Sequence, residues 1–302
     1  MIRVLVTGAR GQVGSEVARA LEGRAEVLAH DRSTLDLANL AEVSRGVREA
    51  RPDVIVNAGA YTAVDRAEAE EDTARAVNGV APGVLAEEAK RAGALLIHFS
   101  TDYVFDGTKE GPYVESDAPH PLSAYGRTKL EGERAIAASG APCLVLRTSW
   151  VYAPHGRNFL LTMLKLAQTR DEVRVVDDQR GAPTSSLQLA RATLELFTRG
   201  DRTRALAPGD VSRVKDSAGL YHATAAGETT WFGFAQAIFA ALPDAPRLVA
   251  IPTSEYPTPA RRPLNSVLSS ARLHSALGVA LCGWREGLDE VMRSEAVLRA
   301  GG

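Results

Sequence analysis

The residue types best suited to chemistry in this chain are Tyr125 and Lys129, which stand four positions apart in a helical pattern. This spacing places the phenol and the ammonium on one helix face. When hydride reaches a ketone, an alkoxide forms, and a positioned acid must supply a proton. We expect Tyr125 to be that acid, with Lys129 lowering the pKa of the phenol and binding a nicotinamide ribose. Taken alone, this spacing fits an exposed contact on a helix better than a catalytic pair, so the catalytic interpretation depends on other residues.

Two hydroxyl side chains strengthen the catalytic interpretation. Ser100 and Thr101 directly follow the apolar run at 95–99. Open α/β sheets bind ligands at the carboxyl ends of such strands. A hydroxyl there can donate a hydrogen bond to a carbonyl oxygen and stabilise the charge that develops on it. The alternative for Thr101 is a cap at the start of a loop, but the order of the motifs along the chain favours catalysis.

A glycine loop precedes these residues in the chain. Gly8, Gly11 and Gly14, with Gln12 and Val13 between the last two, lie between the first apolar run and the first helical segment. Backbone N–H groups in such a loop face an incoming pyrophosphate. The spacing differs from the common GxGxxG pattern, and an isolated triplet could be an ordinary turn. Its place at the first strand-to-helix junction predicts a dinucleotide site.

An acidic residue in the expected place supports this cofactor site. Asp31 follows the second predicted strand, where a carboxylate would bind the adenosine ribose hydroxyls. Arg10 and Arg32 could instead hold a 2′-phosphate, so the sequence leaves NADPH and NADH both open. Asp36 and Leu37 follow shortly and could lie near the adenine, although Asp36 alone would read as a helix cap.

The elements that must position these residues alternate regularly over the first 150 residues. Such alternation predicts an α/β fold, a Rossmann-like doubly wound parallel sheet. The expected strands cover 3–7, 25–29, 54–57, 95–99 and 143–147, and the expected helices cover 14–21, 40–50, 80–92 and 125–138.

The regular alternation of strands and helices ends after Trp150, which predicts a smaller C-terminal lobe. We divide the chain into a dinucleotide-binding Rossmann domain at 1–150 and a mainly substrate-binding lobe at 151–302, and we expect some C-terminal segments to return to the sheet. The lobe should contain a helix at 158–168, strands at 173–176 and 219–222, a helix that starts near Thr229 and a proline-rich loop at 252–263.

Composition excludes several functional classes. The chain has 302 residues and is 45% hydrophobic, enough for a sizeable core. Its formal net charge of -2 argues against a nucleic-acid partner. Two distant cysteines predict neither disulfides nor a cysteine zinc site and fit a cytoplasmic location. The N-terminus reads as a strand, and no apolar run reaches membrane-spanning length, so we expect no membrane partner.

At this point the chain resembles the extended short-chain dehydrogenase/reductase superfamily and, within it, the dTDP-4-dehydrorhamnose reductase family. The resemblance spans essentially the whole length. The segments that carry it are Gly11-Gln-Val-Gly14, Val56-Asn-Ala-Gly-Ala-Tyr-Thr-Ala-Val-Asp65, Ser100-Thr-Asp-Tyr-Val-Phe-Asp-Gly107, Tyr125-Gly-Arg-Thr-Lys-Leu-Glu-Gly-Glu133, Arg147-Thr-Ser-Trp-Val-Tyr152, Asp178-Gln-Arg-Gly-Ala-Pro-Thr184 and Arg262-Pro-Leu-Asn-Ser266.

The resemblance implies NAD(P)H-dependent reduction of the C4 ketone of dTDP-4-dehydro-6-deoxy-L-mannose to dTDP-L-rhamnose, the last step in making a cell-surface sugar donor. It implies that Tyr125 is the proton donor, Lys129 its partner and Thr101 the hydroxyl that polarises the ketone. Specificity for the thymine nucleotide and for the sugar stereochemistry rests wholly on this resemblance.

Further contacts follow from the same resemblance. Asp102 and Trp150 would touch the sugar, although Trp150 fits a core aromatic equally well. Arg262, with Arg261 beside it, would bind the nucleotide diphosphate. The family pattern also places Ala60, Tyr61 and Thr62 along the cofactor and Asn78 in a supporting network. His98, between two apolar residues, is expected to be a core histidine.

Several questions stay open at this stage. Relatives can carry Mg²⁺ at a dimer interface, but Glu16, Glu286, Asp289 and Glu290 form no distinctive pattern, and we predict no metal. The sequence does not decide whether the chain forms a homodimer. An epimerase or dehydratase of the same superfamily would use similar residues, as would a regulatory subunit like that of methionine adenosyltransferase. The intact Thr101, Tyr125 and Lys129 argue against a purely regulatory role.

Overall fold

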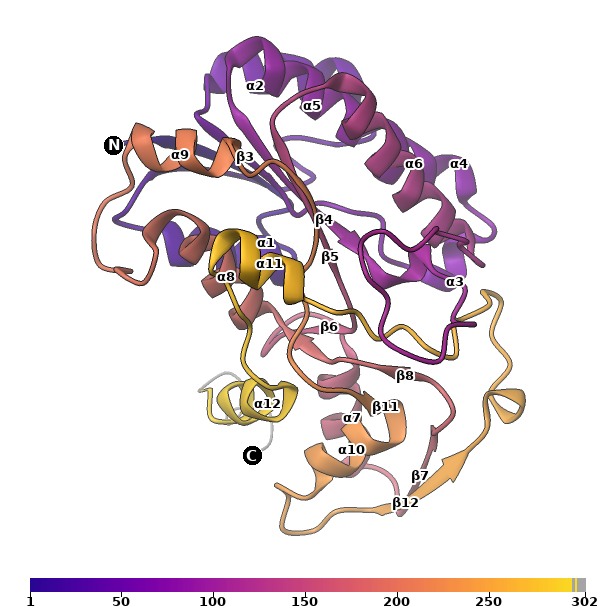
Figure 1. Cartoon of the computed structure of the whole chain (residues 1–302). Coiled ribbons are helices and arrows are strands. Elements are labelled where there is room, and N and C mark those ends of the chain that lie inside the picture. The colour runs from indigo at the N-terminus through magenta and orange to yellow at the C-terminus, as the bar shows by residue number, and fades with distance from the viewer. Residues whose placement is uncertain (295–296, 298–302) are drawn as a thin grey trace.

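A parallel sheet of six strands lies at the centre of the chain, whose computed structural model describes residues 1–294 and 297 (Figure 1). The spatial order is β2-β1-β3-β4-β5-β10, and every neighbouring pair is parallel. These strands are β1 (Arg3–Thr7), β2 (Glu26–His30), β3 (Val54–Asn57), β4 (Leu95–Thr101), β5 (Cys143–Thr148) and β10 (Gly219–His222).

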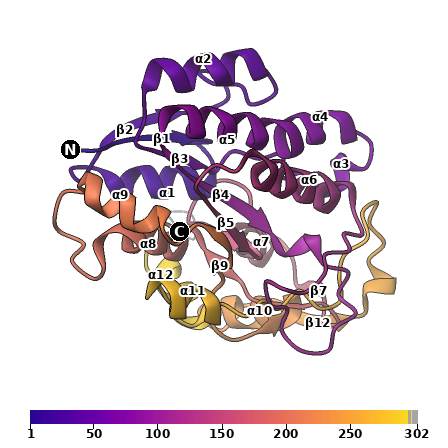
Figure 2. The ribbon, with the colours of Figure 1, turned by 45° about the horizontal axis from the view of Figure 1, so that its top comes forward.

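Helices cover both faces of this sheet, as Figures 1 and 2 show. Apolar residues of the strands therefore meet helices on either side, which explains why β3 and β4 are buried along their whole length. One face carries α1 (Gln12–Leu21), α8 (Ser186–Thr198), α9 (Pro208–Lys215) and α11 (Ala271–Leu277). The other carries α2 (Leu40–Ala50), α5 (Ala81–Ala92) and α6 (Ala124–Ser139).

A group of short helical segments connects β3 to α5. Their bounds are α3 (Val64–Ala67), α4 (Glu71–Arg75) and a π-helical turn, η1 (Ala76–Val80). The turn brings Asn78 into a buried position beside α6. Turns of this kind often occur at functional sites, because they redirect a side chain without ending the helix.

A smaller lobe with its own apolar core lies below the sheet in Figure 1. Its helices are α7 (Phe159–Ala167), α10 (Trp231–Phe239) and α12 (Trp284–Met292), and β7 (Glu172–Val176) pairs with β12 (Arg247–Ile251). The short strands are β6 (Val151–Tyr152), β8 (Arg180–Gly181), β9 (Thr184–Ser185) and β11 (Thr229–Thr230), and the 3₁₀ turns are η2 (Asp102–Val104) and η3 (Thr253–Glu255).

The predicted fold class is confirmed, since the sheet is parallel and covered on both faces. β10 returns to the sheet beside β5, and α8 packs on α1, so the C-terminal half contributes to both cores. The elements expected from the sequence did not include β12, α9, α11 or α12.

The strand order places a topological switch point at β1. β1 has β2 on one side and β3 on the other, so the direction of winding reverses there. Open α/β sheets bind ligands outside the carboxyl ends of strands at this switch point. The glycine loop after β1 and the residues after β3, β4 and β5 all lie at this edge of the sheet.

Candidate active site

Helix α6 holds Tyr125 and Lys129 on the face that meets β4. Ser123 caps the helix, its hydroxyl oxygen accepting a hydrogen bond from the Gly126 amide at 3.2 Å. Gly126 has no room for a side chain, because a Cβ there would lie 2.2 Å from the carbonyl oxygen of Tyr103. The glycine therefore lets the first turn of α6 approach η2, which brings Tyr125 next to the end of β4.

Tyr125 and Thr101 form a pair at this edge. The Tyr125 phenol and the Thr101 hydroxyl influence each other at this edge of the sheet. Burial raises the pKa of Tyr125 to about 12, and the Thr101 side chain opposes part of that rise. The Thr101 oxygen also accepts from the Tyr103 amide at 3.2 Å, which fixes its position. Tyr125 therefore keeps its proton at neutral pH, as a proton donor requires.

Lys129 is 2% exposed and lies one turn along the same helix. Its Nζ donates to the carbonyl oxygen of Phe99 at 2.6 Å and lies 3.2 Å from Nε2 of His98. Burial lowers the pKa of Lys129 to about 8, while the charge of Glu133 raises it. We expected Lys129 to depress the pKa of Tyr125, but burial dominates at Tyr125, and Nζ is engaged by β4 instead.

Asp102 lies beside Thr101 and is also buried. Its Oδ1 accepts a hydrogen bond from the Thr101 hydroxyl at 3.1 Å. Burial raises the pKa of Asp102 to about 7. Ser100, the other hydroxyl after 95–99, donates to the Glu133 carboxylate at 2.5 Å. Thr101 is therefore the hydroxyl next to Tyr125, whereas Ser100 faces the interior of the protein.

The glycine loop has the shape expected of a phosphate cradle. Gly8 has a φ of 67°, and a Cβ there would lie 2.6 Å from the Cα of Gly59. A Cβ at Gly14 would lie 2.2 Å from the carbonyl oxygen of Gly8. Gly11 caps α1, and Gln12 and Val13 form its first turn, so their amides face the end of the sheet. Glycine is required where this loop folds against the neighbouring backbone.

Asp31 lies just after β2, as the sequence predicted, and it is already engaged. Its carboxylate accepts hydrogen bonds from the amide and hydroxyl of Ser33 at 2.8 and 2.6 Å, which lower the pKa of Asp31. The Arg10 guanidinium lies 2.7 Å from Asp31, and Arg32 lies 3.6 Å from Asp36. Both arginine side chains are about 85% exposed, so each can reorient towards a phosphate.

The remaining predicted cofactor residues surround the end of β3. A Cβ at Gly59 would lie 2.6 Å from the side chain of Leu37, so this buried leucine packs against the strand end. Ala60 and Tyr61 are half-buried, and Thr62 is exposed. The Asn78 amide accepts from the backbone N–H of Tyr61 at 2.8 Å and donates to its carbonyl oxygen at 3.0 Å. Asn78 thus fixes the predicted cofactor segment, as expected of a supporting residue.

Trp150 lies two residues beyond β5 and joins the two cores. Its ring stacks on Trp231 at a centroid separation of 3.7 Å and an interplanar angle of 6°. The backbone of Trp150 has a φ of 47°, rare for a bulky residue. A Cβ at Gly181 would lie 2.4 Å from the indole, so glycine makes room for the stack. Trp150 is partly exposed, at the same sheet edge as Thr101.

Arg262 connects the proline-rich loop to the surroundings of Tyr125. Its Nη2 lies 2.9 Å from Asp65, in the short helix α3, and Asp65 also accepts from the Ala260 amide at 3.2 Å. Arg262 also interacts with Tyr103, whose ring meets Tyr125 edge-on at 5.9 Å. Arg261, in contrast, is exposed. The structure therefore brings Arg262 close to the site and leaves its neighbour in solvent.

Two of the acidic residues considered for Mg²⁺, Glu16 and Glu290, have other partners. Glu16 is buried and contacts Arg19 and His155, the latter at 3.0 Å, and Glu290 pairs with Arg191 at 2.5 Å. Within residues 1–294 and 297, no three His, Cys, Asp or Glu side chains group as a metal site. No helix among the described residues is long and apolar enough to cross a membrane.

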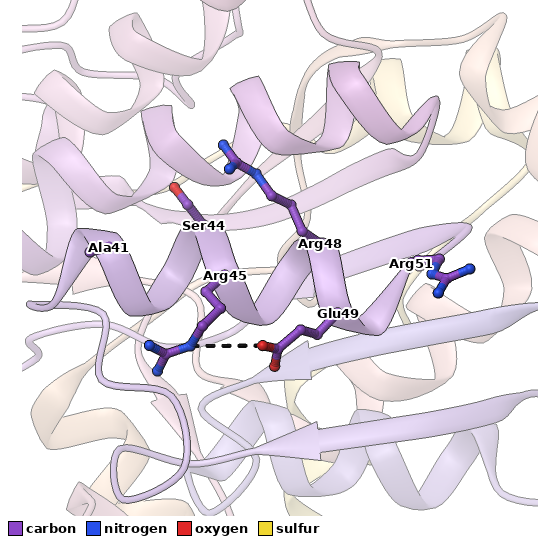
Figure 3. Close-up of a pocket in the computed structure, with 6 residues that line it drawn as sticks. All are labelled: Ala41, Ser44, Arg45, Arg48, Glu49 and Arg51. Atoms are coloured by element: carbon purple, nitrogen blue, oxygen red, sulfur yellow. Dashed lines mark ion pairs between the residues drawn. The ribbon is translucent and has the colours of Figure 1, made fainter.

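A hollow elsewhere on the surface does not overlap the predicted site. Figure 3 shows it along α2, with Arg45 and Glu49 paired across it. Its lining residues are Ala41, Ser44, Arg45, Arg48, Glu49 and Arg51. Since Arg48 is bound by the buried Glu88 at 2.6 Å, this hollow is a feature of the α2–α5 surface.

The chain matches one protein family along nearly its whole length. The model of the RmlD substrate binding domain family matches residues 2–297. A dTDP-4-dehydrorhamnose reductase from Burkholderia thailandensis is 49% identical, with 94% of this chain and 96% of the relative covered. The chain belongs to the RmlD family. The family and reductase class predicted from the sequence are thereby confirmed.

Solved structures of RmlD family members agree with this assignment. A dTDP-4-dehydrorhamnose reductase from Clostridium acetobutylicum has a TM-score of 0.88 and 38% identity, covering 96% of this chain and 98% of the other. One from Bacillus anthracis, in complex with NADP, has a TM-score of 0.87 and 32% identity, with the same coverage.

Sequence reasoning missed several residues at this RmlD-family site. Asp65 holds Arg262, and Trp231 stacks on Trp150, yet neither stands near its partner in sequence. His98 was expected in the core, and it is buried there, but it also lies within hydrogen-bond distance of Lys129. A polar residue in an otherwise apolar strand was the one available signal for that role.

Proposed function

We propose that this RmlD-family chain reduces the C4 ketone of dTDP-4-dehydro-6-deoxy-L-mannose to dTDP-L-rhamnose, with Thr101, Tyr125 and Lys129 as its catalytic residues. The observation that carries the assignment of residues is that the fold brings Tyr125, in the first turn of α6, beside Thr101 at the end of β4, one helical turn from a buried lysine. Nearly full-length similarity to curated reductases supports the choice of substrate.

The residues at the switch point fit a nicotinamide dinucleotide. The supporting observation is the cradle formed by Gly8, Gly11 and Gly14, which a side chain at Gly8 or Gly14 would fill. Gly8 to Gly14 would hold the pyrophosphate, Asp31 or Arg10 the adenosine ribose or its phosphate, and Ala60 to Thr62 the adjoining groups. When bound, reduced NADPH or NADH supplies the hydride.

The chain's own residues account for the proton. The Thr101 hydroxyl and the Tyr125 phenol would both donate hydrogen bonds to the C4 oxygen, which favours charge on that oxygen as the carbon gains hydride. The O–H bond of Tyr125 then breaks, a new O–H bond forms at C4, and a phenolate remains. Lys129, whose Nζ is bound by the Phe99 carbonyl and His98, would place a positive charge one helical turn from the phenolate until solvent returns a proton. The net change is one hydride and one proton added to the ketone.

Three side chains around this position would hold the substrate. Asp102, next to Thr101, would contact a sugar hydroxyl, and the partly exposed face of Trp150 would pack against the deoxysugar. Arg262 would bind the diphosphate through its planar guanidinium.

We also propose a cytoplasmic location, which is supported by Cys143 and Cys282, since neither forms a disulfide.

The direct test measures oxidation of NADPH and NADH by the purified chain with enzymatically generated dTDP-4-dehydro-6-deoxy-L-mannose. The reductase assignment predicts one dinucleotide consumed per ketone, with dTDP-L-rhamnose as product. A tightly held NAD that is regenerated without net consumption would instead identify an epimerase or dehydratase. If the chain binds the dinucleotide but shows neither reductase nor epimerase or dehydratase activity, the result would favour a regulatory function.

A further inference from the structure

A chain of buried polar groups runs behind Lys129, away from the substrate side. Nε2 of His98 lies 3.2 Å from Nζ of Lys129, and Nδ1 of His98 lies 2.9 Å from Nδ2 of Asn57. The Thr7 hydroxyl donates to Oδ1 of Asn57 at 2.7 Å. These four side chains are each at most 2% exposed and come from β1, β3, β4 and α6.

The hydrogens along this chain cannot be assigned independently. A neutral imidazole has one N–H donor and one acceptor nitrogen. If Asn57 donates to Nδ1, the ring proton must lie on Nε2, facing Nζ of Lys129. Nζ can accept that proton only as a neutral amine. When Nδ2 of Asn57 faces Nδ1 of His98, as in this structure, the hydrogen bonds are therefore satisfied only if Lys129 is uncharged.

The opposite arrangement suits a charged lysine. An ammonium has three donors and no lone pair, so Nε2 of His98 must accept and Nδ1 must carry the proton. Half a turn of the Asn57 amide exchanges Oδ1 and Nδ2 with almost no change in shape, so Oδ1 can accept from Nδ1. Thr7 permits both arrangements, because its hydroxyl can donate to Oδ1 or accept from Nδ2.

We propose that His98 is a positioning residue for Lys129: Nε2 accepts a hydrogen bond from the ammonium while Asn57 holds the Nδ1 proton, and the tautomer and the amide both reverse when Lys129 becomes neutral. This inference rests on the proposed function only in that Lys129 serves catalysis. A histidine that served packing alone would have no reason to couple its tautomer to the lysine.

Burial keeps His98 neutral, which the inference requires. Burial and the adjacent Lys129 charge both hold the pKa of His98 well below its usual range. The ammonium therefore receives two neutral acceptors, the Phe99 carbonyl and His98, rather than a carboxylate. The titratable or charged groups around Lys129 are His98 on β4, Asp102 after β4, Tyr125 and Glu133 on α6, and Arg147 on β5 behind Glu133.

The test uses the full chain labelled with ¹⁵N in its histidine rings and saturated with NADPH. Long-range ¹H–¹⁵N spectra identify which ring nitrogen carries the proton, and His98→Gln identifies the His98 signals. We expect the proton on Nδ1 well below the Lys129 pKa of about 8, and on Nε2 well above it. One tautomer at both pH values, or a doubly protonated ring at the lower one, would overturn the inference.

Variants separate positioning from packing. His98→Leu removes the acceptor, so the basic limb of the kcat/KM profile should move about one pH unit towards acid. His98→Gln keeps an acceptor and should restore most of that shift. His222→Gln is the matched control, because His222 is equally buried but bonds to the Tyr113 carbonyl, and it should leave the profile unchanged.

The outcomes distinguish this inference from the proposed function. An unshifted profile in His98→Leu, with normal NADPH oxidation, contradicts the role of His98 alone. A tautomer exchange that persists in Lys129→Met would contradict it as well. Failure of the wild-type chain to oxidise NADPH, together with a pH-dependent tautomer, contradicts the proposed reaction but supports the coupling of His98 to Lys129.

Discussion

Glu133 and Arg147 form a buried, two-bonded ion pair directly behind the proposed catalytic residues. Nε of Arg147 donates to Oε1 at 2.9 Å and Nη2 to Oε2 at 2.6 Å, with the side chains 8% and 3% exposed. Glu133 lies one turn after Lys129 on α6, and Arg147 lies on β5. Since Ser100 also donates to Glu133, the pair ties α6 to both β4 and β5.

Arg147→Met should therefore destabilise the protein strongly. The substitution leaves Glu133 buried without its partner, which typically costs about 3–5 kcal/mol. Arg45→Met is the matched control, because its pair with Glu49 on α2 is about 70% exposed and should contribute less than about 1 kcal/mol. Urea unfolding measures both. Equal losses would show that the buried pair does not anchor α6.

Tyr125→Phe tests the proton donor. The substitution removes one hydroxyl and keeps the ring, so the edge-on contact with Tyr103 and binding of NADPH should persist. We expect kcat to fall about 10²-fold or more, since a positioned general acid contributes roughly that factor. Steady-state kinetics and a fluorescence titration of NADPH measure the two effects. Unchanged turnover would remove Tyr125 from the mechanism.

The positions of the proposed catalytic residues were foreseeable from the sequence to a large extent. Tyr125 and Lys129 are four residues apart on one helix, so helical geometry alone places them together. Thr101 ends a strongly apolar strand, and its position follows from the rule that open sheets bind ligands at strand ends. These inferences depend on local periodicity, which a single sequence records.

Other features depend on contacts between distant segments and left no local signal. Asp65 meets Arg262 across 197 positions, and Trp150 meets Trp231 across the junction of the two cores. The dominant influence on Tyr125 was also misjudged. Proximity in sequence suggested that Lys129 would control its pKa, whereas the depth of burial, a property of the whole fold, has the larger effect.

Lys129 should give the reaction a pH limit. Burial lowers the pKa of Lys129 from 10.5 to about 8. Activity that needs the ammonium should therefore fall as the pH rises through about 8. The free energy of unfolding should rise with pH between about 8 and 10.5, because in that range lysine is charged in the unfolded chain and neutral in the folded one.

Lys129→Met should abolish the fall of activity above about pH 8 and impair both NADPH binding and kcat. Loss of one effect without the other would contradict its dual role.

Arg10 and Asp31 should set the choice between the two dinucleotides. A carboxylate favours ribose hydroxyls and repels a 2′-phosphate, whereas a free guanidinium binds that phosphate. Asp31→Asn should therefore raise the ratio of kcat/KM for NADPH to that for NADH by about 10-fold, and Arg10→Ala should lower it by a similar factor. Arg24→Ala, in the turn beyond the C-terminal end of α1, is the control. Equal ratios in all four proteins would place the adenosine end elsewhere.

Arg262 and Asp65 should govern binding of the nucleotide sugar. Arg262 is 21% exposed and is held by Asp65, whereas Arg261 is exposed. Lysine at position 262 keeps the charge but loses the planar pair of donors, so Arg262→Lys should raise KM for the nucleotide sugar about 10-fold or more. Arg261→Lys is the matched control and should change KM less than about 2-fold. Asp65→Asn should give an intermediate increase in KM, because Arg262 remains but loses its ionic partner.

If Arg261→Lys and Arg262→Lys raise KM equally, the loop binds the diphosphate through its overall charge. If neither does, Arg262 holds the loop on α3 and has no substrate role.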